Sequence, residues 1–159
     1  NYNSIGVLYS NAGATDKAIE FYEKALEENP HDKHAYANLG STLLYKKPKQ
    51  AKEYLQKALN IDPEHDIALI ELGKIDKSEG NTVAAQVKFR KAYDLYLKQW
   101  KTNSLPKYAY GWFATVAEEL EENNFAKEIR ASAPKTESEA YYNKENLSMT
   151  KTKALTNNN

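Results

Sequence analysis

The sequence predicts an all-α fold, an α-solenoid built of antiparallel helix pairs. Residues 18–40 and 51–73 align without a gap at an offset of 33 residues. A fixed period of this length is typical of stacked helical repeats. Nine residues are identical at this offset, and in the first segment they are Ala18, Glu20, Lys24, Ala25, Leu26, Pro30, Ala35, Leu39 and Gly40.

Glycine and proline recur at fixed phases of the repeat. Gly6, Gly40 and Gly73 fall in the middle of predicted helices, where Gly is about 1 kcal/mol less favourable than Ala. A repeated unfavourable residue indicates a steric need, so we expect a large side chain of the neighbouring helix to pack on bare backbone. Pro30 and Pro63 follow the second helix of each pair, because Pro cannot continue a helix interior.

The repeat resembles the tetratricopeptide repeat family. The first unit matches the family's pattern of large, large, Gly, aromatic, Ala, aromatic, Ala and Pro with Tyr2, Ile5, Gly6, Tyr9, Ala18, Tyr22, Ala25 and Pro30. The resemblance is strong over residues 2–101, weaker over 107–133 and absent beyond. Asp76 stands where the third unit should have an apolar residue. The resemblance implies a right-handed solenoid whose first helices line a concave surface that binds peptides.

Apolar periodicity and helix-breaking residues place the individual helices. Thr15 or Asp16 is expected to cap the second helix and Asp32 the third. Pro48 suits the first turn of the fourth helix. The predicted helices are 1–11, 16–28, 33–46, 49–60, 66–79, 82–101, 107–122 and 125–132.

Residues 1–134 are predicted to form the repeat domain. We expect three regular units, at about 1–32, 33–65 and 66–101, and a degenerate fourth unit at 105–134. Terminal units of such arrays are atypical because one face meets water. Residues 135–159 read as a polar tail in which a capping box predicts a short helix at 137–147.

The predicted helix 82–101 is longer than a second helix of the repeat should be. Tyr93, Tyr96 and Trp100 extend its apolar stripe past the usual end of the unit. We expect this extension to cover either the last unit of the array or a partner.

Composition excludes several classes of function. Lys and Arg number 22 and so do Asp and Glu, so the net charge is zero and no global field favours nucleic acid or membrane. No apolar run approaches the length of a membrane-spanning helix. With no cysteine, thiol chemistry is absent and the compartment stays open. Because Asn1 lies inside a repeat, we expect a fragment or a processed form.

The candidates for chemistry are few. His31, His34 and His65 lie in or beside turns between units, and we expect solvated turn residues rather than metal ligands, because successive units keep His31 and His65 apart. The acidic residues of 118–122 read as a charged helix face. With no catalytic constellation, metal site or cofactor motif, the sequence predicts a protein that is not an enzyme.

A basic run offers a weaker alternative. Lys88, Arg90, Lys91 and Lys98 alternate with aromatic residues and suggest RNA binding. The aromatic residues, however, fall at core positions of the helix and the cations at solvent positions. We therefore expect no nucleic-acid partner.

The predicted binding site is the concave groove formed by the first helices, which suits a peptide or helix of a partner protein. Its sharpest feature is an apolar patch of Leu44, Tyr45, Ile67 and Ile70, residues not needed for the core. The candidate groove residues are Val7, Asn11, His34, Asn38, Ser41, Leu44, Tyr45, Ile67, Ile70, Lys74, Lys77 and Tyr108.

The sequence does not match the carboxylate-clamp subclass of the family. Co-chaperones that hold a terminal carboxylate use two Lys, two Asn and an Arg. The matching positions here are Asn3, Val7, Asn38, Ile67 and Glu71, of which only Asn38 fits. The charge-assisted bonds to a carboxylate are therefore missing.

Two other readings stay open. The array can serve as a structural segment that associates with itself or with other parts of a longer chain. It can also regulate a catalytic domain that lies outside these residues.

Overall fold

The structure, a computed structural model, describes residues 1–134, and every regular element in that range is a helix. The predicted helix at 137–147 lies outside the described residues. The helices are α1 (Tyr2–Asn11), α2 (Thr15–Glu28), α3 (Lys33–Leu43), α4 (Pro48–Ile61), α5 (Asp66–Ser78), α6 (Thr82–Lys101), α7 (Ala109–Glu119) and α8 (Asn123–Ala131). The chain divides into two compact units, residues 1–88 and a unit that starts at Phe89, so the division falls inside α6.

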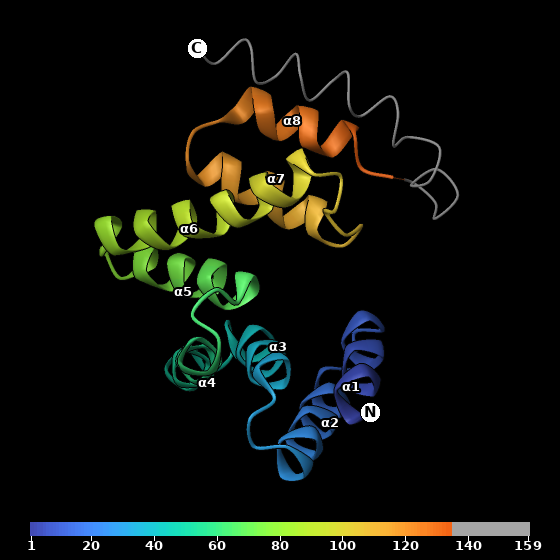
Figure 1. Cartoon of the computed structure of the whole chain (residues 1–159). Helices are drawn as coiled ribbons and strands as arrows, with labels where there is room; N and C mark the ends of the chain where they lie inside the picture. Colours follow the sequence, from blue (N-terminus) through green and yellow to red (C-terminus); the bar gives the residue numbers. More distant parts are fainter. Residues whose placement is uncertain (135–159) are drawn as a thin grey trace. The chain divides into compact units, whose positions relative to one another are not determined.

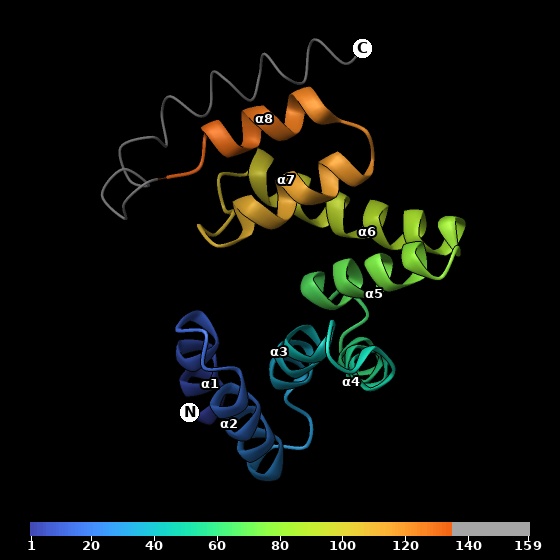
Figure 2. The same ribbon diagram turned by 180° about the vertical axis from the view of Figure 1, so that it is seen from behind.

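The first unit is a stack of helix pairs. Each helix from α1 to α5 contacts the next along the chain, and α1 also contacts α3, as α3 does α5. Both ribbon views show α1 beside α2 and α3 beside α4 (Figures 1 and 2). The first helices of successive pairs thus form one layer, which is the arrangement of a helical solenoid.

Two apolar clusters hold this stack together. One gathers Ala18, Tyr22, Leu39, Leu43 and Ala51. The other gathers Ala37, Leu55, Ala58, Ala68, Leu72 and Ile75. Leu44 is partly buried and packs against both clusters. It therefore joins the α1–α4 core to the α3–α5 core, and the prediction that Leu44 is not needed for the core is wrong.

The second unit, described from Phe89 to Pro134, is built on aromatic rings. Trp100 of α6 lies edge-on to Phe113 of α7 and Phe125 of α8, with ring centroids 6.3 and 5.2 Å apart. Tyr93 and Tyr96 add contacts to Phe113 at 5.4 and 5.8 Å. The extension of α6 therefore packs against the α7–α8 pair. Of the two roles expected for it, it covers the last unit of the array.

Two helices end earlier than the sequence predicts. The helix predicted at 33–46 ends at Leu43, because Pro48 disfavours helical backbone at Lys47, which adopts φ −141°. The helix predicted at 107–122 spans Ala109–Glu119. Glu121 has φ +65°, and a left-handed residue of this kind ends a helix.

The caps also differ in part from the prediction. Asp32 caps α3, since its side chain accepts from the backbone N–H of His34 and Ala35 at 3.0 Å. The cap of α2 is Ala14, with no side-chain hydrogen bond. The prediction of Thr15 or Asp16 as the cap is therefore wrong, and Asp16 instead lies in the first turn, where an acidic residue suits the positive end of the helix dipole.

Candidate functional site: the layer of first helices

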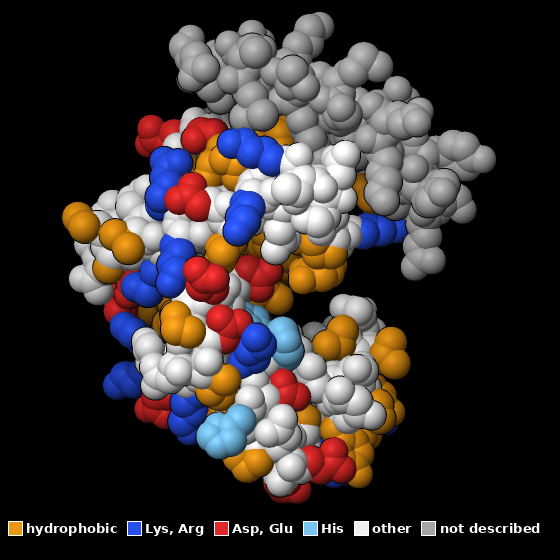
Figure 3. Space-filling view, in the orientation of Figure 1, with side chains coloured by type: hydrophobic (Ala, Val, Ile, Leu, Met, Phe, Trp, Pro, Cys, Tyr) orange, Lys and Arg blue, Asp and Glu red, His pale blue; other side chains and the backbone are white. Residues whose placement is uncertain are grey.

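The candidate surface is formed by α1, α3 and α5, and we call it the first-helix surface. Its polar residues are Asn3, Asn11, His34, Asn38, Ser41, Glu71, Lys74 and Lys77. Figure 3 shows Lys, Arg, Asp and Glu side chains interspersed on the visible face of the molecule. The surface is therefore of mixed charge, and its individual contacts decide what it can bind.

An asparagine pair joins α1 to α3. The Asn38 Nδ2 group donates to Asn3 Oδ1 at 2.9 Å. Val7 lies half-buried against the neighbouring apolar cluster, and Asn11 is exposed at the end of α1. The amides of Asn3 and Asn38 are therefore fixed by each other across the two first helices.

Two histidines converge between α3 and α5. His34 Nδ1 and His65 Nε2 lie 3.0 Å apart, and the ring centroids are separated by 5.0 Å. His65 is only 4% exposed, and its Nδ1 accepts from the backbone N–H of Ala68 at 3.4 Å, capping α5. The prediction that these histidines are solvated turn residues is therefore wrong for His65. His31 remains exposed.

Burial affects the titration of His65. Desolvation lowers the pKa of His65, Asp66 opposes the shift, and neighbouring His34 adds to it. A hydrogen bond between two imidazole nitrogens needs one donor and one acceptor. Protonating both rings would place two donors face to face, so this hydrogen bond requires at least one neutral ring.

A carboxylate and a hydroxyl lie buried in the first-helix layer with atoms that lack partners. Glu71 of α5 is 4% exposed, and its Oε2 has no hydrogen-bond partner among the described residues. Its Oε1 lies 3.4 Å from Lys74 Nζ. The Ser41 Oγ atom of α3 is likewise buried and unpartnered in the described part of the chain. Burial raises the pKa of Glu71, against the influence of Lys74.

The predicted apolar patch does not form as expected. Ile70 is 0% exposed and belongs to the core, so the prediction that it contributes to an exposed patch is wrong. Ile67 is half-buried, and Leu44 is committed to the core as described above. Tyr45, at 90% exposed, is the one fully exposed member of the four. Tyr108 is 65% exposed and belongs to the second unit.

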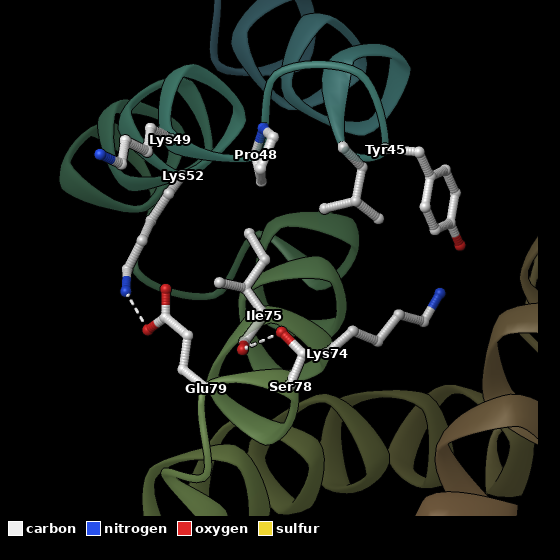
Figure 4. A pocket seen from close by; sticks show the side chains of 9 residues that line it. Tyr45, Pro48, Lys49, Lys52, Lys74, Ile75, Ser78 and Glu79 are labelled. Carbon is white, nitrogen blue, oxygen red and sulfur yellow. Dashed lines mark hydrogen bonds and ion pairs between the residues drawn. The ribbon is translucent and has the colours of Figure 1, made fainter.

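Sequence reasoning missed a pocket of about 480 Å³ at one end of the first unit. It lies between the α3–α4 turn, the start of α4 and the end of α5 (Figure 4). We call it the turn pocket, and its lining residues are Leu44, Tyr45, Pro48, Lys49, Lys52, Lys74, Ile75, Ser78 and Glu79. The available signal was the lysine run of residues 46–52, KKPKQAK, next to an aromatic residue.

The remaining candidates for chemistry are engaged in structural contacts. The Nη1 and Nη2 atoms of Arg130 both donate to the Glu118 carboxylate. Tyr93 donates its hydroxyl to Glu122 at 2.6 Å. Within residues 1–134, no group of three or more His, Asp or Glu side chains is placed to hold a metal ion.

The basic run on α6 differs from a stacking platform for bases. Tyr93, Tyr96 and Trp100 are at most 6% exposed, and their rings pack in the second unit. Lys88 lies 2.5 Å from Asp76, with which it forms an ion pair. No helix in the described part of the chain is long and apolar enough to span a membrane.

Comparisons with known proteins agree with this architecture. Residues 2–32 and 34–65 each match a sequence profile described as tetratricopeptide repeat. No curated protein sequence matches the chain.

Solved structures extend the likeness beyond these two repeats. A structure described as a functional characterization of Pseudomonas aeruginosa pilF is 21% identical, with a TM-score of 0.57, and the match covers 99% of this chain and 67% of that one. A crystal structure of MamA protein is 21% identical, with a TM-score of 0.54 and coverage of 91% and 72%. A second MamA crystal structure is 20% identical, with a TM-score of 0.53 and coverage of 91% and 77%. At this identity the likeness concerns the fold.

The repeat matches, the stacked helix pairs and the mid-helix glycines agree with one another. Residues 2–32 and 34–65 are tetratricopeptide repeats, and the helical solenoid that contains them is a protein-interaction repeat module.

Proposed function

We propose that the chain is an adaptor that binds a peptide or helical segment of a partner protein along the first-helix surface. The observation that carries this proposal is the pair of buried, unpartnered acceptors on that surface, Ser41 Oγ and Glu71 Oε2. A buried polar atom left without a hydrogen bond is unfavourable by about 1–3 kcal/mol. A bound segment that offers N–H or O–H donors would satisfy these atoms once the Ser41 and Glu71 side chains turn toward it.

The polar character of the layer supports the same reading. The amide of Asn38 and the ammonium of Lys74 add a hydrogen-bonding group and a charge beside the buried acceptors. Peptide recognition in grooves relies on polar groups that fix the orientation of a main chain. This surface therefore suits a segment held by its backbone and by one or two side chains.

The proposed mode excludes a carboxylate clamp. Asn3 and Asn38 bond to each other, and the buried Glu71 carboxylate at a clamp position would repel a terminal carboxylate. We propose likewise that the partner is a protein rather than nucleic acid and that the chain is not an enzyme. The buried aromatic rings of α6 and the balanced charge support a protein partner over nucleic acid.

A selection with displayed random linear peptides tests the proposal. The selected peptide is labelled and titrated against the chain by fluorescence anisotropy. The double variant Ser41→Ala with Glu71→Met removes both unpartnered acceptors, so we expect it to be as stable as the wild type or more stable, yet to bind the peptide at least about tenfold more weakly, ~1.4 kcal/mol. Glu53→Met removes an exposed carboxylate from α4 and is the matched control.

The combination of retained stability and lost binding separates a binding role from a structural one. A peptide that binds the double variant and the wild type equally would contradict the proposal. So would equal weakening in Glu53→Met, which would indicate a general effect of charge.

Self-assembly is the second candidate, and the start of α6 favours it. Val83 and Val87 are one helical turn apart and are 80% and 64% exposed. Two such side chains on one helix face suit burial against another molecule. Sedimentation velocity over a range of concentrations would then show association that Val83→Glu with Val87→Glu abolishes. A monomer at all concentrations would contradict this alternative.

A further inference from the structure

The floor of the turn pocket is apolar. Leu44 reaches it from the α3–α4 corner, and Ile75, which is 6% exposed, reaches it from α5. The Pro48 ring lies at the start of α4, and the exposed Tyr45 ring stands at the edge (Figure 4). Aromatic and aliphatic walls around a small hollow accept a single apolar side chain, as anchor pockets of interfaces do.

The rim of the pocket is positively charged. Lys49, Lys52 and Lys74 line it. The one acidic lining residue, Glu79, lies 2.6 Å from Lys52 and neutralises it, and Lys74 lies 3.4 Å from Glu71 Oε1, which leaves Lys49 as the cation of the rim farthest from a carboxylate in these ion pairs. Two further lysines at positions 46 and 47 are exposed in the adjoining turn. The charge that surrounds the apolar floor therefore suits an acidic ligand.

The backbone adds to this field. The first turn of α4 contains no acidic residue, and its N-cap makes no side-chain hydrogen bond. The positive end of that helix dipole is thus not offset locally, in contrast to α2, whose first turn contains Asp16. Lys49, which lines the pocket, lies in this same turn.

We propose that the turn pocket binds an acidic peptide segment of a partner protein, with one apolar side chain of that segment on the floor formed by Leu44 and Ile75. The acidic side chains lie against Lys49 and Lys74 and the start of α4. The proposal rests on the proposed protein-binding function and adds a second surface to it. This surface shares Leu44, Tyr45 and Lys74 with the predicted groove residues, but its other residues lie on α4 and at the end of α5.

Peptide is favoured over nucleic acid by the composition of the rim. Its cations are lysines rather than the planar guanidinium groups that bind phosphate in two-pronged fashion. Tyr45 is a single exposed ring, whereas strands of bases stack on several. A sugar-phosphate backbone has no apolar side chain that could fill such a pocket.

The experiment is a fluorescence anisotropy titration of the full chain with a synthetic peptide in which acidic residues flank one central tryptophan. We expect Lys49→Glu and Tyr45→Ala each to weaken binding by about tenfold or more. We also expect the affinity to fall as salt is raised, because exposed charges are screened. Replacing the tryptophan of the peptide by alanine, or its acidic residues by lysine, should abolish binding.

Matched controls separate the pocket from general charge. Lys17→Glu makes the same substitution in the first turn of another second helix, α2, and changes the net charge equally. Tyr108→Ala removes another exposed tyrosine. Both variants should bind the peptide as the wild type does. Glutamate in the first turn of a helix is favourable, so the Lys49→Glu variant is expected to fold.

Four results would overturn the proposal. Equal weakening in Lys17→Glu would indicate non-specific attraction, and unchanged binding in Tyr45→Ala or with the alanine peptide would indicate charge without an anchor. A single-stranded oligonucleotide that binds the pocket as tightly as the peptide would assign it to nucleic acid.

The binding proposals for the first-helix surface and for the turn pocket can be tested independently of each other. Ser41→Ala with Glu71→Met should leave binding of the acidic peptide intact or strengthen it, because Glu71 no longer neutralises Lys74. Lys49→Glu should leave binding of a first-helix peptide intact. Loss of the acidic peptide in the first of these variants would also overturn the turn pocket as an independent surface.

Discussion

Two glycines in the first unit lie where a neighbouring helix packs directly on backbone. A Cβ atom at Gly40 would lie 2.6 Å from Leu55 Cγ and 3.1 Å from the Ala51 carbonyl oxygen. A Cβ atom at Gly6 would lie 2.5 Å from Tyr22 Cε1. Non-bonded contacts of a Cβ atom under 3.0 Å essentially never occur, so the glycine at this phase of the repeat meets a steric need, as the sequence predicts.

Substitution of these glycines gives the first prediction. Gly40→Ala should destabilise the first unit by about 1–3 kcal/mol, because Leu55 and the α4 backbone must move. Gly111→Ala is the control, since a Cβ there meets nothing within 4 Å. That variant should be neutral or more stable by roughly 0.4–1 kcal/mol. Urea denaturation measures both, and an unchanged midpoint for Gly40→Ala would contradict the assigned register.

The buried histidine gives a pH prediction. The pKa of His65 is lowered from 6.5 in the folded chain, so between that lowered value and 6.5 the unfolded chain binds more protons. Stability is therefore complete above pH 6.5 and is lost as pH falls towards the folded pKa. We expect a lower melting temperature at pH 5.5 than at pH 7.5. His65→Asn should reduce this difference, because Asn caps a helix without titrating in this range.

Two groups need separate treatment in that measurement. Lys33 and Asp62 form an ion pair at 2.7 Å beside the histidines, and Lys33 lowers the pKa of the Asp62 carboxyl further below this pH range. Glu71 has a raised pKa and contributes with the opposite sign, since stability falls as pH rises towards its folded pKa. The test is therefore the change between variants. His31→Asn, in an exposed turn, should leave the pH dependence unaltered, and an equal change in both variants would contradict the assignment to His65.

At the scale of elements, one ion pair explains why the sequence departs from the family pattern. Asp76 of α5 is 7% exposed and binds Lys88 of α6 at 2.5 Å. The apolar residue expected at that position is thus replaced by a carboxylate with a cation from the next helix. The two residues belong together, because a buried charge without its partner is strongly unfavourable.

The third prediction follows from this pair. Lys88→Met should destabilise the first unit by about 3–5 kcal/mol, because it leaves the Asp76 carboxylate buried and uncompensated. Asp76→Leu with Lys88→Met restores the apolar pattern and should be close to the wild type or more stable. A double-mutant cycle by thermal denaturation measures the coupling. Equal losses in the single and double variants would indicate that the pair contributes nothing specific.

At the scale of the whole molecule, the two units have different kinds of core. The first is built of small and aliphatic residues between repeated helices. The second, described from Phe89 to Pro134, rests on interlocking rings of α6, α7 and α8. In repeat proteins, stability is approximately a sum of local terms and nearest-neighbour terms. A defect in one core should therefore be felt most in its own helices.

The fourth prediction uses that locality. Phe113 is fully buried at the centre of the ring cluster, and Phe113→Ala should destabilise the second unit by about 3–5 kcal/mol. Hydrogen exchange should accelerate in α7 and α8 and change little in α1 and α2. Leu55→Ala in the first unit is the complementary variant, with the larger effect expected in α3 and α4. Uniform acceleration throughout the chain in either variant would contradict the local description.

The sequence by itself determined the helices and their pairing. Period, glycine phase and proline position are local signals, and they led to the α-solenoid, the identity of each helix and the cap at Asp32. It also anticipated that Asp76 departs from the pattern. The boundary errors at 44–46 and 120–122 arose where single turn residues, Lys47 and Glu121, end the helical backbone.

Only the tertiary structure decided which surface residues are available. It buried Ile70, committed Leu44 to two cores, joined His34 to His65 and opened the turn pocket between residues about thirty positions apart. The extent of the predicted groove and the boundaries of the repeats stay predictions. The physical reason is that helical periodicity is set within a few residues, whereas burial and pairing depend on how side chains from separate helices fill the space between them.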